Sequence, residues 1–344
     1  MPAPYSPPFT ITPRQLNLVG EICERIGRWG GGGSSLSPQL RKANRIQSIQ
    51  ASLEIENNSL GIDQVTAILE GKRVLGSVRE IQEVRNAIGC YDHLASWNPN
   101  SVEDFLSAHG MMMKALTDHA GQFRPGGVGV YRGDQLVHMA PPADRVENLV
   151  GDLFQWSAKT DLHPLIASSI LHYEIEFIHP FADGNGRLGR LWQSLSLSHW
   201  HAELVYLPME SLVRDRQAEY YGALCAADRL AEATPFVDFM LTIINETLEA
   251  FPASDQVSDQ VSDQVSDQVK SLLRAYGTDS ELSSDELLRR LGLRHKPTFR
   301  ENYMNPASVL RLIEMTEPDS TRSPTQRYRL TDCGQKFIPA LKQK

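Results

Sequence analysis

Length, composition and charge set the first limits on this chain. With 344 residues it has room for two or three domains, and 41% hydrophobic and 22% charged residues are ordinary for a soluble globular protein. The formal net charge of −8 is uneven, since residues 270–344 carry 14 Lys and Arg against 9 Asp and Glu, whereas the rest carries 20 against 33. An acidic body with a basic tail indicates two separate roles.

The distribution of apolar and basic residues excludes a membrane-spanning protein and a secreted protein. No apolar run reaches the about 18 residues that a membrane-spanning helix needs. The start, "MPAPYSPPFT", lacks the basic residues and apolar core of a signal peptide. The four cysteines lie far apart without a CxxC pair, which argues against a disulfide scaffold and a zinc site. We therefore expect a reduced, cytoplasmic protein with no membrane partner.

Apolar residues recur at helical spacing through most of the first 250 residues, which predicts a mainly α-helical body. In chain order, helices are predicted over 11–29, 40–69 (with a turn at 57–61), 78–94, 102–119, 143–157, 161–178, 187–201, 214–231 and 235–251. A glycine- and serine-rich break separates the first two. Between residues 121 and 142 the pattern becomes strand, turn and strand around "RGDQ", which predicts one β-hairpin.

The C-terminal third begins with a repeat. "SDQV" occurs four times over residues 254–269, which predicts a helical spacer, with a coiled-coil contact as the alternative. A capped helix is predicted over 283–293, a second helical region over 294–316 and a β-hairpin over 313–331. Helix, helix and hairpin with basic residues are typical of a winged helix.

One stretch, "FIHPFADGNGRLGRLW" (residues 177–192), concentrates chemically useful side chains. Its GxGxxG does not predict a dinucleotide site, because the apolar run before it is too long for a strand and no repeating βαβ units surround it. No P-loop sequence is present either. Glu176 and His179 form a single E-x-x-H, whereas a di-iron bundle needs two such pairs, so a metal-ligand role for His179 is disfavoured.

The residue types in this stretch favour an anion site. The turn at 184–186 leads into a helix, whose first N–H groups and positive dipole end attract phosphate. Arg187 and Arg190 lie on one face of that helix. Asp183 would repel bare phosphates but could bridge to them through Mg²⁺. His179 titrates near neutrality and can accept a proton from a hydroxyl. Together they indicate phosphoryl or nucleotidyl transfer.

The segment "HPFADGNGRLGR" (residues 179–190) resembles the Fic-family signature HPFx(D/E)GNGRxxR at every specified position. The resemblance extends from about Asn44 to about Leu248. The hairpin "VYRGDQLVHMAPP" resembles the family's flap, and "SLEIEN" (residues 52–57) resembles its inhibitory motif (S/T)xxxE(G/N). The resemblance implies a helical fold with a β-hairpin flap. It also implies AMP transfer from ATP, with Mg²⁺, to hydroxyl side chains of proteins.

Carried over by position, the resemblance gives each motif residue a role. His179 looks like the general base, Asp183 the holder of Mg²⁺, and Arg187 and Arg190 the contacts of the β- and γ-phosphates. Phe181 would anchor the loop. The backbone anion site would consist of Gly184, Asn185 and Gly186. An acceptor hydroxyl would attack the α-phosphorus in line and expel pyrophosphate.

Three further sets of residues follow from the resemblance. The flap would pair with the backbone of the target as an added strand, and its residues are Val130, Gln135, Leu136, Val137, His138 and Met139. Tyr220 and Tyr221 are candidates for the adenine pocket, with a place in the helix core as the alternative. Glu56 would pair with Arg190 and block the γ-phosphate, with Ser52 orienting it. The alternative for Glu56 is an exposed helix charge.

We accordingly predict four parts. They are an N-terminal helical region with the inhibitory motif (1–95), a Fic-type catalytic core (96–250), a helical repeat spacer (251–269) and a winged-helix-like domain (270–344). Protein substrates and the protein itself are the expected acceptors. The oligomeric state is open, with a homodimer as one alternative.

A function of a different class stays open as well. In it the winged helix binds nucleic acid and the Fic core only senses nucleotide. Arg294, His295, Lys296 and Arg300 would face phosphates, with the hairpin at 322–329 as the wing. A protein-docking role for this domain is the competing interpretation. Within the family, transfer of phosphate or phosphocholine, and removal of AMP, are further alternatives.

Overall fold

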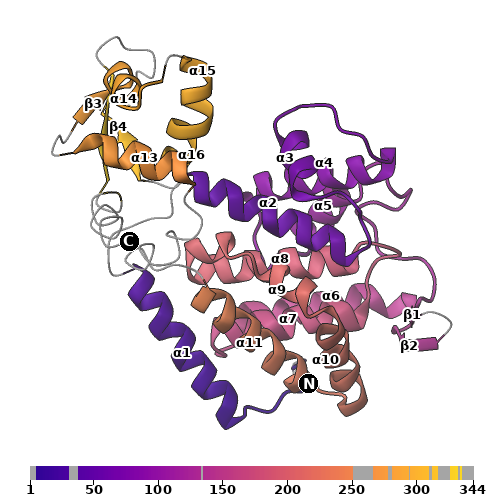
Figure 1. Ribbon diagram of the computed structural model, residues 1–344. Coiled ribbons are helices and arrows are strands. Elements are labelled where there is room, and N and C mark those ends of the chain that lie inside the picture. The colour runs from indigo at the N-terminus through magenta and orange to yellow at the C-terminus, as the bar shows by residue number, and fades with distance from the viewer. Residues whose placement is uncertain are drawn as a thin grey trace. The chain divides into compact units, whose positions relative to one another are not determined.

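The structure is a computed structural model that describes residues 5–30, 38–132, 135–250, 266–277, 281–293, 295–309, 312–316, 326–331 and 334. The chain forms two compact units, Met1–Phe251 and Pro252–Lys344 (Figure 1). None of the described helices combines the length and apolar composition that crossing a membrane requires.

The first unit is helical apart from one hairpin, as predicted. Its helices are α1 (Pro13–Gly30), α2 (Pro38–Ile55), α3 (Ile62–Leu69), α4 (Val78–His93), α5 (Val102–Met112), α6 (Val146–Lys159), α7 (Pro164–Ile178), α8 (Asn185–Trp200), α9 (Met209–Asp215), α10 (Gln217–Leu230) and α11 (Thr234–Ala250). The hairpin consists of β1 (Gly129–Arg132) and β2 (Gln135–Met139), which pair in antiparallel register.

Helix α7 is the centre of this unit. It is mostly apolar and is buried on nearly all sides, polar Ser169 and His172 included, with α6, α8 and α11 packed against it (Figure 1). Ile170 on one face belongs to an apolar cluster shared with α11, and Leu171 and Ile175 on the other belong to a cluster shared with α5, α6 and α8. The signature loop begins where α7 ends, so the interior of the unit fixes its position.

Helices α2, α3 and α4 form a smaller layer beside the signature loop. They share an apolar cluster that includes Ile49, Leu53 and Val84. The predicted turn between α2 and α3 contains Asn57 in a left-handed conformation (φ 67°). Ser77 caps α4 in a reciprocal capping box with Glu80. This layer brings the predicted inhibitory segment into the same compact unit as the signature loop.

Two predicted helices are shorter than their apolar pattern. Helix α5 ends at Met112 instead of His119, because Ala115 turns left-handed (φ 60°). The Asn86 side-chain amide stabilises that end by donating to the carbonyls of Met112 (3.0 Å) and Lys114 (2.8 Å). The predicted helix 214–231 is divided into α9 and α10 at Arg216, which pairs with Glu246 of α11. Tertiary contacts override the periodicity in both places.

The second unit combines short helices with a three-stranded sheet. Its elements are α13 (Asp267–Tyr276), β3 (Glu281–Ser283), α14 (Ser284–Arg290), α15 (Lys296–Phe299), a π-helical turn (Arg300–Met304), α16 (Asn305–Val309), β4 (Ile313–Met315) and β5 (Arg327–Leu330). The antiparallel sheet has the order β3-β5-β4, so the predicted hairpin is present as β4 and β5. Strand β3 was not predicted.

The repeat region lies mostly outside the described residues. The structure does not describe residues 251–265, which make up most of the predicted helical spacer, so that prediction is not tested there. Helix α13 begins within the last repeat, with Ser266 as its N-cap. Val269 of that repeat is fully buried in the core of the second unit beside Leu272. The final repeat therefore contributes to the C-terminal fold as its first helical turn.

Candidate functional site

Two left-handed residues set the backbone of the signature loop between α7 and α8. His179 caps α7 with φ 49° and ψ 59°, and its N–H donates to the Ile175 carbonyl (3.0 Å). Gly184 precedes α8 with φ 90°. A Cβ at Gly184 would lie 2.7 Å from the Met113 sulfur, so both the backbone angle and the close approach require glycine. The loop thus enters α8 with its first N–H groups outside the helical ladder, where an anion can bind.

The interior of the loop is fixed by Asn185 and Phe181. The Asn185 amide accepts from the Phe181 N–H and donates to the Phe181 carbonyl, each at 2.9 Å. The Phe181 ring is fully buried and stacks on His109 at a centroid distance of 3.6 Å. The Nδ1 of His109 accepts from the Gly121 N–H, so its Nε2 carries the proton and donates to the Asp183 carbonyl (3.0 Å). The loop is thereby preorganised.

Arg190 on α8 contacts the predicted inhibitory residues. Its Nη2 donates to the Glu56 carboxylate (2.8 Å) and to the Ser52 carbonyl (3.0 Å), and its Nε donates to the Ser52 hydroxyl (3.1 Å). The Arg190 side chain is 3% exposed and that of Glu56 is 33% exposed. Burial alone would lower the pKa of Arg190, but the charge and hydrogen bond of Glu56, together with Tyr220 and Glu176, outweigh burial and raise it. Ser52 therefore holds Arg190, the partner of Glu56, through both its hydroxyl and its carbonyl.

Glu56 also lies against the start of α8. A Cβ on Gly186 would lie 2.5 Å from its Oε1 atom, closer than any side chain could come. The carboxylate therefore occupies space directly beside the first turn of α8, where the predicted anion site lies. Glycine at position 186 allows either a carboxylate or a phosphate to approach the backbone this closely. The Glu56 carboxylate thus lies where the sequence predicts a bound phosphate.

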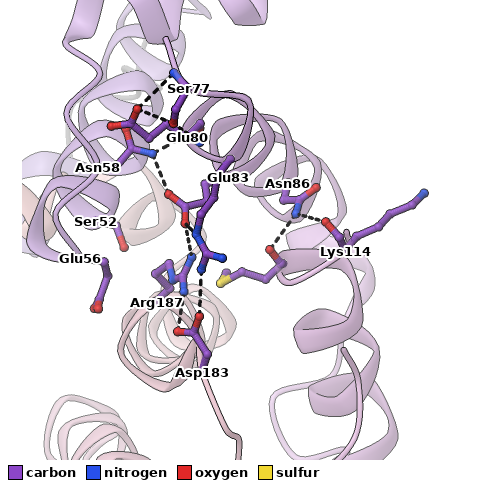
Figure 2. Close-up of polar contacts among 12 residues, drawn as sticks. Ser52, Glu56, Asn58, Ser77, Glu80, Glu83, Asn86, Lys114, Asp183 and Arg187 are labelled. Atoms are coloured by element: carbon purple, nitrogen blue, oxygen red, sulfur yellow. Dashed lines mark hydrogen bonds and ion pairs between the residues drawn. The ribbon is translucent and has the colours of Figure 1, made fainter. Parts of the chain in front are cut away.

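A second network of charged side chains surrounds Asp183 and Arg187 of the motif (Figure 2). The Arg187 guanidinium is 5% exposed and pairs with Asp183 (2.9 Å) and with Glu83 of α4 (3.5 Å). Arg79, one turn before Glu83, pairs with both Glu83 and Asp183 at 3.3 Å. Glu83 also accepts from Asn58, which follows the inhibitory segment, at 2.8 Å. Sequence reasoning missed Arg79, Glu83 and Asn58, because nothing local to α4 marks its contact with the motif.

His179 lies in an environment that favours the neutral imidazole. Burial lowers its pKa to about 4, and nearby positive charges contribute in the same direction. A neutral ring at physiological pH can accept a proton, as a general base must. The preceding turn carries Glu176, whose pKa burial raises to about 7 and whose Oε1 atom has no hydrogen-bond partner. Burial thus lowers the pKa of His179 and raises the pKa of the neighbouring Glu176.

The flap lies beside the end of α7, with its base fixed to the loop. Arg124 donates to the carbonyls of His179 (2.7 Å), Gly126 (2.6 Å) and Pro141 (2.5 Å), which joins both ends of the hairpin to the signature loop. Met139 is 63% exposed at the end of β2. The side chains of Val130, Gln135, Leu136 and Val137 lie outside the described residues, although their backbone pairing in the hairpin is described.

The two tyrosines predicted for an adenine pocket have different environments. Tyr220 is 1% exposed, and its hydroxyl lies 3.2 Å from the Nε2 atom of buried His172. It therefore occupies the helix core, the alternative weighed from the sequence. Tyr221 is 36% exposed and packs against Tyr220. An adenine-binding role stays a prediction, and Tyr221 has the more accessible ring.

The residues around Asp183 fit a magnesium ion held partly by substrate. Among the described residues no group of three or more His, Cys, Asp or Glu could hold a metal ion alone. Asp183 is 45% exposed and stands at the mouth of the anion site. Mg²⁺ commonly binds through one or two carboxylates plus substrate phosphates, which is the donor set available here.

Comparison with known proteins identifies the family of this chain. The description "Fic/DOC family" matches residues 99–197, and "Filamentation induced by cAMP protein Fic-like, C-terminal domain" matches residues 267–331. The crystal structure of a Fic family protein from Desulfovibrio desulfuricans G20 is 55% identical, covers 95% of this chain and 99% of its own, and has a TM-score of 0.70. This chain belongs to the Fic family.

More distant Fic proteins share part of the chain. "Protein adenylyltransferase Fic" of Nematostella vectensis is 26% identical over 256 residues, which are 70% of this chain and 56% of that protein. "Protein adenylyltransferase fic-1" of Caenorhabditis briggsae is 30% identical over 201 residues, which are 55% of this chain and 38% of that protein. This Fic protein thus spans about half or less of the length of these curated relatives.

A solved Fic-1 fragment from C. elegans shares the fold, with 23% identity, a TM-score of 0.56 and coverage of 69% of this chain and 70% of that one. The signature at 179–190 falls inside the Fic match, whereas Glu56 and Ser52 lie before it. The roles of Glu56 and Ser52 are therefore argued from their contacts in this chain and not from the family match.

In the second unit, the residues predicted to face nucleic acid are only partly described. Lys296 pairs with Asp285 at 2.7 Å, and the Nδ1 atom of His295 lies 2.8 Å from the Thr298 hydroxyl. Arg300 is exposed. Arg294 and the tip of the predicted wing, including Arg322, lie outside the described residues. On β5, Arg329 pairs with Glu314.

Proposed function

We propose that this Fic protein is an adenylyltransferase that moves AMP from ATP to Ser, Thr or Tyr hydroxyls of proteins, including its own. The hydroxyl oxygen bonds to the α-phosphorus while the bond to the β-phosphate oxygen breaks, so pyrophosphate leaves. His179 accepts the hydroxyl proton at its ring nitrogen. Supporting this, burial lowers the pKa of His179 and so favours the neutral ring, and α8 begins directly after the loop without a side-chain cap on its first N–H groups.

Each charged motif residue has a task in this reaction. Arg187 and Arg190 bind the β- and γ-phosphates, and their burial makes these charge-assisted contacts strong. Asp183 would hold Mg²⁺, which neutralises phosphate charge when bound. The Phe181 ring and the Asn185 amide keep the loop rigid, so little reorganisation is needed as charge develops.

The proposed resting state is autoinhibited, and the Glu56–Arg190 pair is the observation that carries this claim. Arg190 donates to Glu56 through the guanidinium that would otherwise hold the γ-phosphate. The same carboxylate lies against Gly186 and puts a negative charge beside the anion site. ATP that binds this state would have its triphosphate turned away from in-line attack. Whether addition or removal of AMP dominates stays open in this proposal.

Labelled ATP tests the proposal. The full chain and its Glu56→Gly variant are incubated with ATP labelled at the α- or the γ-phosphate, and label in protein is measured. Incorporation of the α-label alone is expected, because AMP is transferred and pyrophosphate leaves. Incorporation of the γ-label alone would replace AMP transfer by phosphorylation. Incorporation of neither label, by either protein acting on itself or on cell extract, would refute transferase activity.

The second unit supports a separate docking role. Helices α14 to α16 followed by β4 and β5, with β3 completing the sheet, have the order of a winged helix. We propose that this domain, set off by the repeat, recruits a protein or duplex DNA. Salt-dependent binding of duplex DNA by the full chain, lost on removal of residues 270–344, would favour DNA. A cytoplasmic location and a homodimer remain predictions from the sequence.

A further inference from the structure

His138, at the base of the flap on β2, has an acceptor at each ring nitrogen. Its Nδ1 atom lies 2.8 Å from the Asp228 carboxylate on α10, and its Nε2 atom lies 2.8 Å from the Phe177 carbonyl at the end of α7. Neither an ionised carboxylate nor a carbonyl can donate a hydrogen bond, and a neutral imidazole carries a single N–H. Both contacts are satisfied only when the ring carries two protons and a positive charge.

The surroundings favour that charge. The carbonyl ends of a helix carry partial negative charge, and the imidazole lies at the C-terminal end of α7. Tyr173 donates to the second oxygen of Asp228 (3.0 Å), so both carboxylate oxygens accept a hydrogen bond. Burial opposes a charge on His138, but its contacts with Asp228 and Phe177 outweigh burial and raise its pKa, with Glu176 adding to the effect.

We propose that doubly protonated His138 is the positioning residue of the flap. Its two hydrogen bonds connect β2 to both α7 and α10, two residues before Ala140. They thereby set the distance between an acceptor strand and His179. The proposal rests on the adenylyltransferase function and deepens it, because it names what holds the acceptor side in place. The His138 side chain touches neither acceptor nor nucleotide in this account.

The same charge acts on the catalytic base. The titratable and charged groups around His138 are Asp228, Glu176, His179 and, through the loop carbonyls, Arg124. Burial is the main cause of the low pKa of His179, and the positive charge of His138 lowers it further. Loss of the His138 proton would therefore loosen the flap while leaving His179 able to act as a base.

The sign of the pH dependence follows. His179 must be neutral, which holds above its pKa of about 4. His138 must be charged, which holds below its raised pKa and is lost as the pH rises through that value. Transfer should accordingly show an acid limb from His179 and an alkaline limb from His138. In Asp228→Asn the pKa of His138 falls, so the alkaline limb should move to lower pH.

Nuclear magnetic resonance of the full chain with ¹⁵N-labelled histidine reads the protonation state directly. The His138 signals are assigned by their loss in His138→Gln. At pH 7 the wild-type ring should show two protonated nitrogens, and Asp228→Asn should shift it toward the neutral form. A neutral His138 at pH 7 in the wild-type chain would overturn the proposal.

Hydrogen exchange and activity test the consequence for the flap. At pH 7, His138→Gln and Asp228→Asn should increase amide exchange in residues 129–140, whereas His119→Gln, at an exposed histidine, should not. His138→Gln should slow AMP transfer by roughly tenfold or more, since a charge-assisted hydrogen bond is lost, and remove the alkaline limb. ATP affinity should change less than about twofold on the same scale.

The two proposals fail separately. If neither the wild-type chain nor Glu56→Gly transfers AMP, the adenylyltransferase function fails, while resonance and exchange data still decide whether a charged His138 holds the flap. If transfer occurs and flap exchange in His138→Gln equals that of the wild type, His138 is not its positioning residue. A parallel loss of ATP affinity and transfer in His138→Gln would also contradict the inference, because it would indicate a general structural defect.

Discussion

The two sides of the signature loop are restrained by different means. On the phosphate side, each charged motif residue meets an opposite charge from the α2–α4 layer: Arg190 meets Glu56, Arg187 meets Glu83, and Asp183 meets Arg79. On the acceptor side, among the described contacts, His179 is restrained by burial and by backbone carbonyls. Ion pairs can be exchanged when a charged ligand arrives, whereas a buried base is fixed in advance. In the mechanism that we propose, regulation therefore belongs to the phosphate side and proton transfer to the acceptor side.

The largest effect is expected from His179→Ala, which removes the ring proposed to accept the proton of the attacking hydroxyl. Loss of a general base typically lowers the rate by about 10²–10⁴-fold. ATP binding should persist, since the phosphate contacts come from α8. The measurement is the rate of AMP incorporation together with ATP affinity, in the Glu56→Gly background. A variant that keeps more than about half of the activity would show that His179 is not the base.

Glu56→Gly should have the next largest effect, in the opposite direction. A shielded, charge-assisted pair contributes roughly 1.5–3 kcal/mol, which corresponds to about 10–100-fold suppression of productive ATP binding. Glu56→Gln should activate less, because it removes the charge but keeps bulk beside Gly186. AMP incorporation by the two variants and the wild type, at equal concentration and with melting temperatures compared, checks the order. Equal activity of all three would mean that Glu56 is an ordinary helix charge.

A smaller effect is expected from Glu83→Gln on the same side. Arg187 would lose an ion pair 3.5 Å long, and the side chain would still accept from Asn58. The pair is long and Arg187 keeps its shorter contact with Asp183, so we expect a gain of only about two- to fivefold in ATP affinity. Glu80→Gln on the same helix is the matched control, because the Glu80 side chain contacts Ser77 and Ser59 and, among the contacts of the described residues, makes none with the motif. A change of the same size in both variants would count against the Glu83 contact.

Removal of residues 270–344 should have the smallest effect on chemistry. The signature loop, the flap and Glu56 all lie in the first compact unit. Self-modification should stay within about twofold of the full chain, which is below the size of effect expected for a lost contact in the site, while partner choice should change. The rate of self-modification and the pattern of labelled proteins in cell extract are measured together. Loss of all self-modification in a truncated chain that still melts cooperatively would contradict this separation.

Sequence predicted the parts of this site that are contiguous in the chain. Residues 179–190 form one loop and one helical turn, so their order already contains their geometry. Glu56 and Arg190 were paired through the family resemblance, and the structure places them 2.8 Å apart. The predicted helices around the motif and the flap hairpin are also present.

The remaining contacts depend on tertiary packing. Glu83 is an ordinary i+4 partner of Arg79 in sequence, and only the packing of α4 brings it to Arg187. His138 and Asp228 come from elements whose adjacency no local pattern reveals. The end of α5 is set by the Asn86 side chain of another helix, which periodicity cannot report. Strand β3 is three residues long and finds its partner in distant β5.

The central claim is that Glu56 acts through Arg190, and a double-mutant cycle tests it most directly. AMP incorporation from α-labelled ATP is measured for the wild type, Glu56→Gly, Arg190→Ala and the double variant. The account predicts that Glu56→Gly raises transfer by about 10–100-fold when Arg190 is present. In the Arg190→Ala background the same change should have little effect, because no shared partner remains. An equal increase in both backgrounds would show that Glu56 restrains the enzyme by another route.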